Sequence, residues 1–192
     1  DYRMSSETVG PTIADDIKTS AMYALIIALI VIFIYIAIRF NKWYYGLGGV
    51  VALFHDSLIT VSLFSIFYGV LPFNLEIDQA FIAAILTIIG YSINDTVIIF
   101  DRIREYVGLY PKRTLKDNMN AALNSTLSRT VNTAVTTLIV LLAIFLFGGE
   151  VIRGFSFALM MGVLIGTYSS IFIATPVSYD LANKKAVDTK KK

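Results

Sequence analysis

Two aspartates lie inside long apolar stretches of this sequence, Asp56 and Asp95. An ionisable side chain at membrane depth is costly unless it is paired, hydrated or neutral, so such residues are candidates for function. Asp95 shares a helical face with Ser92 and Thr96, at spacings of three and four residues. Asn94 is a further polar candidate in the same stretch. We therefore expect proton-binding chemistry around Asp95.

The next apolar stretch offers a cation, Arg129, for Asp95. Antiparallel neighbouring helices would bring the two side chains to similar depths. Burial favours the neutral acid and a nearby guanidinium favours the carboxylate, so a moving arginine would load and release a proton. The alternative is a static ion pair that holds two helices together. The polar positions that continue this stripe are Ser125, Asn132, Thr133 and Thr136.

The neighbouring pair His55-Asp56 is a secondary candidate. Asp56 could be a second proton site, or a partner for Arg129 or His55. It could equally be a hydrogen-bonded structural group. The chain has one histidine and no cysteine, which excludes histidine clusters for zinc, disulfides and thiolate sites. We expect no metal and no cofactor, with protons as the coupling ion.

The composition places these residues in a membrane protein. Hydrophobic residues make up 56% of the chain and charged residues 16%, and the mean hydropathy is +0.70. Soluble domains are less apolar and more charged. The net charge of +2 gives no reason to expect a nucleic-acid partner, because the basic residues follow the membrane topology.

Five stretches are long and apolar enough to cross a bilayer, and they must be helices because lipid offers no partner for backbone groups. The expected fold is an all-α polytopic membrane bundle over residues 20–177. We expect a lead-in at 1–19, a connection at 101–128 and a basic tail at 178–192. The predicted spans are 20–40, 46–68, 80–100, 129–147 and 155–177.

Most lysines and arginines fall in the connections and tail at one side of these spans. By the positive-inside rule that side is cytoplasmic, which leaves the N-terminus outside. An outside N-terminus with no signal sequence leads us to expect a C-terminal piece that lacks at least one upstream span. In the connection 101–128, Pro111 precedes an amphipathic stretch. We interpret this stretch as a helix lying on the inner leaflet, or else as a docking surface for a partner.

A small residue recurs at every fourth position of the last span. Such a ridge lets another helix approach closely, so it predicts packing and says nothing of chemistry. Its members are Ala158, Gly162, Gly166 and Ser170.

The stretch Gly90–Glu105, which contains Asp95, resembles the signature of the SecF family of protein-export membrane proteins. The resemblance extends over about residues 9–181. The other matching stretches are 124–130, 147–155, 166–172, Val9-Gly10-Pro11 and His55-Asp56.

This resemblance implies half of an RND-type transporter in the bacterial inner membrane, with its last five helices present here. It implies a non-enzymatic subunit that uses the proton-motive force to help move secreted polypeptides through the Sec machinery. The family's membrane acid and arginine match Asp95 and Arg129. The implied partners are a SecD half (separate or fused upstream), the SecYEG translocon, YidC, the translocating polypeptide and membrane lipid.

Two other classes of function remain open from the residues alone. One is an RND-like exporter half that moves lipids or small molecules, and the other is a scaffold whose polar residues only join helices. An intramembrane hydrolase is disfavoured, because Asp56 and Asp95 would have to be adjacent and no supporting motif exists.

Overall fold

The structure is a computed structural model that describes residues 11–190, with side chains described between residues 19 and 184. Within this range every regular element is helical, and five helices are long and apolar enough to cross a membrane. The prediction of an all-α polytopic bundle is confirmed. The elements are α1 (Pro11–Phe40), α2 (Trp43–Phe67), α3 (Gln79–Leu109), α4 (Leu115–Phe147), α5 (Glu150–Ser169), η1 (Ser170–Ala174) and α6 (Thr175–Lys190).

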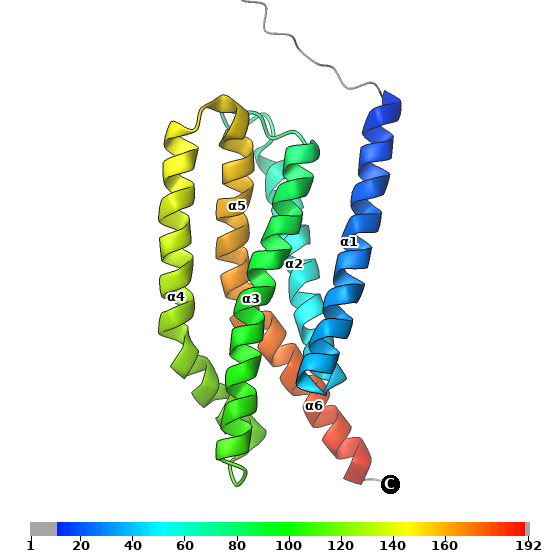
Figure 1. The fold of residues 1–192 in the computed structure, drawn as a ribbon, viewed down its shortest axis with the longest axis vertical. Coiled ribbons are helices and arrows are strands. Elements are labelled where there is room, and N and C mark those ends of the chain that lie inside the picture. Colours follow the sequence, from blue (N-terminus) through cyan, green and yellow to red (C-terminus); the bar gives the residue numbers. More distant parts are fainter. Residues whose placement is uncertain (1–10, 191–192) are drawn as a thin grey trace, which may run out of the picture.

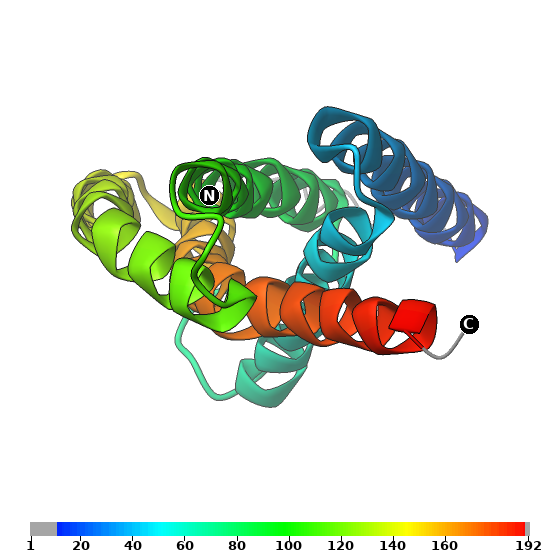
Figure 2. The same cartoon turned by 90° about the horizontal axis from the view of Figure 1, so that it is seen from below.

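The helices form an up-and-down bundle (Figure 1). The α3 and α5 helices pack most extensively against each other, with α2 beside them. The α1 and α4 helices lie at opposite sides, and α6 crosses obliquely beneath the bundle (Figure 2). One end of the bundle holds the α3–α4 turn with Lys112, Arg113 and Lys116, and we call it the basic end. The opposite end holds Glu76 and Glu150, and we call it the acidic end.

The outer helices present large apolar side chains to the surroundings. On α1, Ile27 and Ile38 are 59% and 75% exposed, and on α4 Ile139 is 61% exposed. Such a surface suits lipid and not water. The structure therefore agrees with the membrane character that the composition predicts.

The segment between the third and fourth spans differs from the expected form. The α3 helix continues to Leu109 and α4 begins at Leu115, so the connection is a short turn. The hydroxyl of Thr114 caps α4 by accepting from the Asp117 N–H at 3.1 Å. The amphipathic stretch is thus the beginning of α4, which bends before it continues along the bundle (Figure 1). A separate surface helix is not formed, because nothing after the Thr114 cap interrupts helical bonding.

The last span is interrupted by one wide turn, the π-helical segment η1. Pro176 follows it and has no N–H to give to the carbonyl four residues earlier, which explains why regular bonding fails here. The Thr175 hydroxyl donates to the Ser170 carbonyl at 3.1 Å and so supplies a partner for a backbone oxygen in this turn. The predicted tail at 178–192 is helical through Lys190 as part of α6.

The predicted small-residue ridge is buried, as expected for helix packing. Ala158 and Ser170 are both 0% exposed. At Gly166 a Cβ would lie 2.9 Å from the Cβ of Ser92, and at Gly162 it would overlap Ile88. Glycine is therefore needed at these two positions to allow the close approach of α5 and α3.

Candidate functional site

Asp56 of α2 is the most enclosed carboxylate of the described residues, with 0% exposure. Its Oδ2 accepts hydrogen bonds from the hydroxyls of Ser92 on α3 at 2.6 Å and Ser169 on α5 at 2.8 Å. Its Oδ1 lies 3.2 Å from Nδ1 of His55. Three helices therefore meet at one carboxylate, and both of its oxygens have partners.

A second set of hydrogen bonds lies next to this carboxylate and joins α3 to the start of η1. The hydroxyls of Thr96 and Ser170 are 2.9 Å apart. The Ser170 hydroxyl also lies 3.3 Å from the Ser92 carbonyl and 2.9 Å from that of Gly166. Ser169 and Ser170, which are consecutive, thus contact α2 and α3 respectively.

Asp95 is one helical turn beyond Ser92 on α3 and is 2% exposed. Its Oδ2 is buried and has no hydrogen-bond partner among the described residues. The side chain of Thr167 on α5 lies beside Asp95, but its buried hydroxyl also makes no hydrogen bond by distance and angle. Burying a polar oxygen without a partner costs about 1–3 kcal/mol. Asp95 is therefore enclosed without the bonds that stabilise Asp56.

Arg129 of α4 is exposed on the surface of the bundle. It is near enough for its charge to act on Asp95, but no ion pair joins the two within the part of the chain that the structure describes. Two other predicted candidates, Asn94 on α3 and Asn132 on α4, are also exposed. The predicted polar stripe of α4 thus faces away from the core of this chain.

Arg129 also lines a surface cavity between α3 and α4, with a volume of about 390 Å³. Arg102 in this cavity donates to Glu105 at 2.7 Å and to Ser125 at 3.0 Å. Asp101, at the same place, receives a hydrogen bond from Arg39 at 3.1 Å. The lining of this cavity therefore contains both acidic and basic side chains.

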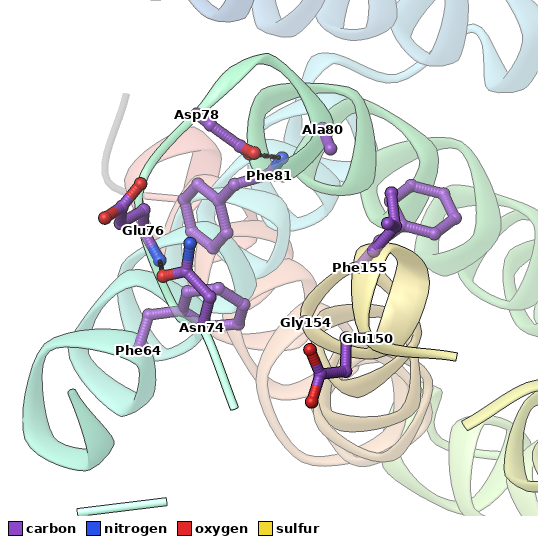
Figure 3. Close-up of a pocket in the computed structure, with 10 residues that line it drawn as sticks. Phe64, Asn74, Glu76, Asp78, Ala80, Phe81, Glu150, Gly154 and Phe155 are labelled. Carbon is purple, nitrogen blue, oxygen red and sulfur yellow. Dashed lines mark hydrogen bonds between the residues drawn. The ribbon is translucent and has the colours of Figure 1, made fainter. Parts of the chain in front are cut away.

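A further cavity of about 330 Å³ lies at the acidic end and is drawn in Figure 3. Glu76, Asp78 and Glu150 line it, together with Phe64 and other residues. The Asp78 carboxylate caps α3 by accepting from the backbone of Phe81 at 2.8 Å. Among the described residues no group of three acidic, histidine or cysteine side chains is placed to hold a metal ion.

The structure therefore divides the predicted site residues into two groups. Asp56, His55 and Ser92 are in contact and Asp95 is buried one turn from Ser92, whereas Arg129, Asn94 and Asn132 are exposed. The sequence analysis missed Ser169 and Thr167. The adjacent serines at 169 and 170 were a signal, but only Ser170 lies on the predicted ridge, whereas both hydroxyls bond to neighbouring helices.

The fold and these enclosed carboxyl groups define a polytopic membrane protein with ionisable side chains buried between its helices. Residues 2–184 match the family described as "Protein export membrane protein SecD/SecF, C-terminal". The chain belongs to this family.

The similar proteins agree with this assignment. The "Protein translocase subunit SecF" of Rhodothermus marinus is 56% identical over 95% of this chain and 59% of its own length. The protein of the same name from Rhodobacter capsulatus is 48% identical over 88% of this chain and 49% of its own length. A solved structure titled "Crystal structure of SecDF in Super-membrane-facing form" is 36% identical, with a TM-score of 0.80. It is matched over 96% of this chain and 24% of that chain. The chain thus spans between half and three fifths of these two relatives' length.

Proposed function

We propose that this chain is the membrane part of a SecF subunit, which couples the proton-motive force to the late stages of polypeptide movement through the Sec machinery. It is a transport subunit and not an enzyme. Family membership and the names of its relatives support the export role. The observation that carries the coupling role is Asp95, a buried acid with an unpartnered oxygen and an exposed arginine near it.

In the proposed mechanism, a proton from the outer side binds Asp95 and removes its attraction to Arg129. The neutral acid no longer favours a nearby cation, so α3 and α4 repack. When the proton leaves toward the cytoplasm, the attraction returns. Moving one charge through 100 mV supplies about 2.3 kcal/mol, enough to shift a two-state equilibrium by several tens of fold. Arg129 stays charged throughout and acts as the counter-ion.

The test is Asp95→Asn in the complete translocation complex. Asparagine keeps the shape but cannot exchange a proton, so stimulation of export by the proton-motive force should be lost while assembly is retained. Asp180→Asn on α6 is the matched control, since Asp180 is an exposed acid away from the bundle core. Export stimulation that remains normal in Asp95→Asn would exclude the coupling role.

The exposed polar face of α4 supports a partner in the membrane. The side chains of Arg129 and Asn132 are exposed in this chain, and lipid tails cannot satisfy such groups. The partner we propose is a SecD half, either a separate chain or a segment fused upstream. SecYEG, YidC and the translocating polypeptide are the proposed partners of the whole assembly.

Because the chain contains no cysteine, this contact can be tested with single cysteines. Asn132→Cys should cross-link to a SecD half that carries a cysteine on its facing helix. Val131→Cys, which is exposed at the same depth of α4 but about 100° away around the helix, is the control and should react far less. Equal yields at both positions would contradict the proposed interface.

The proposed location is the bacterial inner membrane, with the basic end in the cytoplasm. The basic side chains at the α3–α4 turn support this orientation through the positive-inside rule. In right-side-out vesicles, an impermeant thiol reagent should label Glu76→Cys and spare Lys112→Cys. The reverse pattern would place the bundle upside down.

A further inference from the structure

The His55–Asp56 pair is a buried titratable group that the mechanism above does not use. In the described part of the chain, no lysine or arginine makes an ion pair with Asp56. The hydrogen-bond partner of Asp56 on α3 is Ser92, with Asp95 one turn further along that helix. Its partner on α5 is Ser169. No ionisable side chain of the described α1, η1 or α6 residues bonds to either member of the pair. Its charge is therefore balanced by His55 or by a bound proton.

The hydrogen bonds around Asp56 suit both the carboxylate and the carboxylic acid. The Ser169 oxygen lies 2.8 Å from Asp56 Oδ2 and 3.1 Å from the Gly166 carbonyl. Its single hydrogen can point to the carboxylate or turn to the carbonyl and leave its oxygen free to accept. If Asp56 gains a proton on Oδ2, Ser169 therefore needs only to rotate.

His55 gives the enclosed carboxylate a contact with the surface of the bundle. The His55 side chain is 31% exposed, whereas that of Asp56 is 0% exposed. An imidazole has two nitrogens, so one can face Asp56 while the other lies toward the surface of the bundle, near the middle of α2. A proton can thus reach Asp56 without opening the helix contacts around it.

The same segment of α5 contacts both acids. Ser169 bonds to Asp56, and Thr167 lies beside Asp95. The π turn η1 begins one residue after Ser169, and such turns are frequent at functional sites. A change in the Ser169 bond therefore acts on the segment that also borders Asp95.

We propose that the His55–Asp56 pair is a second proton-binding site, which the segment Thr167–Ser170 at the junction of α5 and η1 links to Asp95. Binding converts the Asp56 carboxylate to a carboxylic acid, and the pair gains one positive charge. The coupling of this site to export rests on the proposed function, whereas the binding of the proton does not.

The test is infrared difference spectroscopy of the complete protein in lipid nanodiscs, stepped between acidic and alkaline pH. A protonated buried carboxyl group gives a carbonyl stretch that disappears when it loses its proton. Subtracting the Asp56→Asn spectrum from the wild-type spectrum should leave one carbonyl band. Subtracting the Asp95→Asn spectrum from the wild-type spectrum should leave a different carbonyl band. If subtraction of the Asp56→Asn spectrum leaves no band, Asp56 does not change protonation and the proposal is wrong.

Ser169→Ala keeps the test usable if Asp56→Asn does not fold. Removal of the Ser169 hydroxyl should shift the Asp56 band, whereas Ser57→Ala should not, because the Ser57 hydroxyl bonds only to its own helix at Leu53. Equal effects of the two variants would contradict the assignment. If the Asp95 subtraction gives no band while the Asp56 subtraction does, the proposed function is contradicted, and the proposal of a proton site at Asp56 still stands.

Discussion

Asp56 and Asp95 are both excluded from solvent, yet the structure surrounds them differently. Asp56 is held by two hydroxyls and a histidine from three helices, whereas Asp95 has a buried oxygen without a partner. The first carboxylate is therefore built into the packing of α2, α3 and α5. The second lies between that core and the exposed polar face of α4, where a small movement can change what it meets. Burial alone does not distinguish the two, but hydrogen bonding does.

The largest expected effect comes from removing the enclosed carboxylate. Asp56→Ala leaves the Ser92 hydroxyl without its acceptor, His55 without its partner and Ser169 with only the Gly166 carbonyl, so it should lower the free energy of unfolding by about 3 kcal/mol or more. Asp95→Ala should change the free energy of unfolding by about 1 kcal/mol or less, since it removes a buried oxygen that has no partner among the described residues. Unfolding in bicelles by a denaturing detergent measures both. A larger loss of unfolding free energy for Asp95→Ala than for Asp56→Ala would contradict the view that Asp56 is the more strongly held carboxylate.

A smaller loss is expected where α5 approaches α3 beside Ser92. A methyl group at Gly166 would press on Ser92 and move it from Asp56, so Gly166→Ala should cost about 1–3 kcal/mol. Gly90→Ala is the control, because no atom lies within 4 Å of a Cβ there. It should be neutral or stabilise α3 by up to about 1 kcal/mol. The same detergent unfolding assay applies, and similar losses for both variants would show that this contact is loose.

Ser169→Ala should lower stability by about 1.5 kcal/mol or more, because its hydroxyl donates to a charged acceptor. Ser57→Ala, on the α2 side of the same region, should change stability by about 0.5 kcal/mol or less, since its hydroxyl bonds only to its own helix. Thermal unfolding of the two variants, measured in parallel, gives the difference. The absence of a difference would mean that the Ser169 bond contributes little.

The smallest effect is expected on the α4 side. Arg129 is exposed and makes no ion pair in the described part of the chain, so Arg129→Ala should change the stability of this chain by about 0.5 kcal/mol or less. The measurement is unfolding of the chain alone, without a partner. A loss near that of Asp56→Ala would reveal a static Asp95–Arg129 bond and remove the contrast between the two regions.

Much of the architecture could be predicted from the sequence because lipid imposes strict demands. Apolar length predicts the five spans, and the spacing of small residues predicts the ridge from Ala158 to Ser170. The two acids were recognisable because charge is rare in such stretches. These features depend only on neighbours along one helix, which sequence periodicity describes.

Only the tertiary structure decided which of these residues meet. Periodicity places Ser92 and Asp95 on one face of α3. It cannot show that α2 brings Asp56 into contact with Ser92, or that an oxygen of Asp95 stays without a hydrogen-bond partner. Nor can it show that Arg129 lies on an exposed face, or that the consecutive Ser169 and Ser170 bond to different helices. The physical reason is that each helix is free to rotate and slide until its packing with the others is settled. Contacts between helices therefore follow from the sum of all the interfaces and not from any one segment.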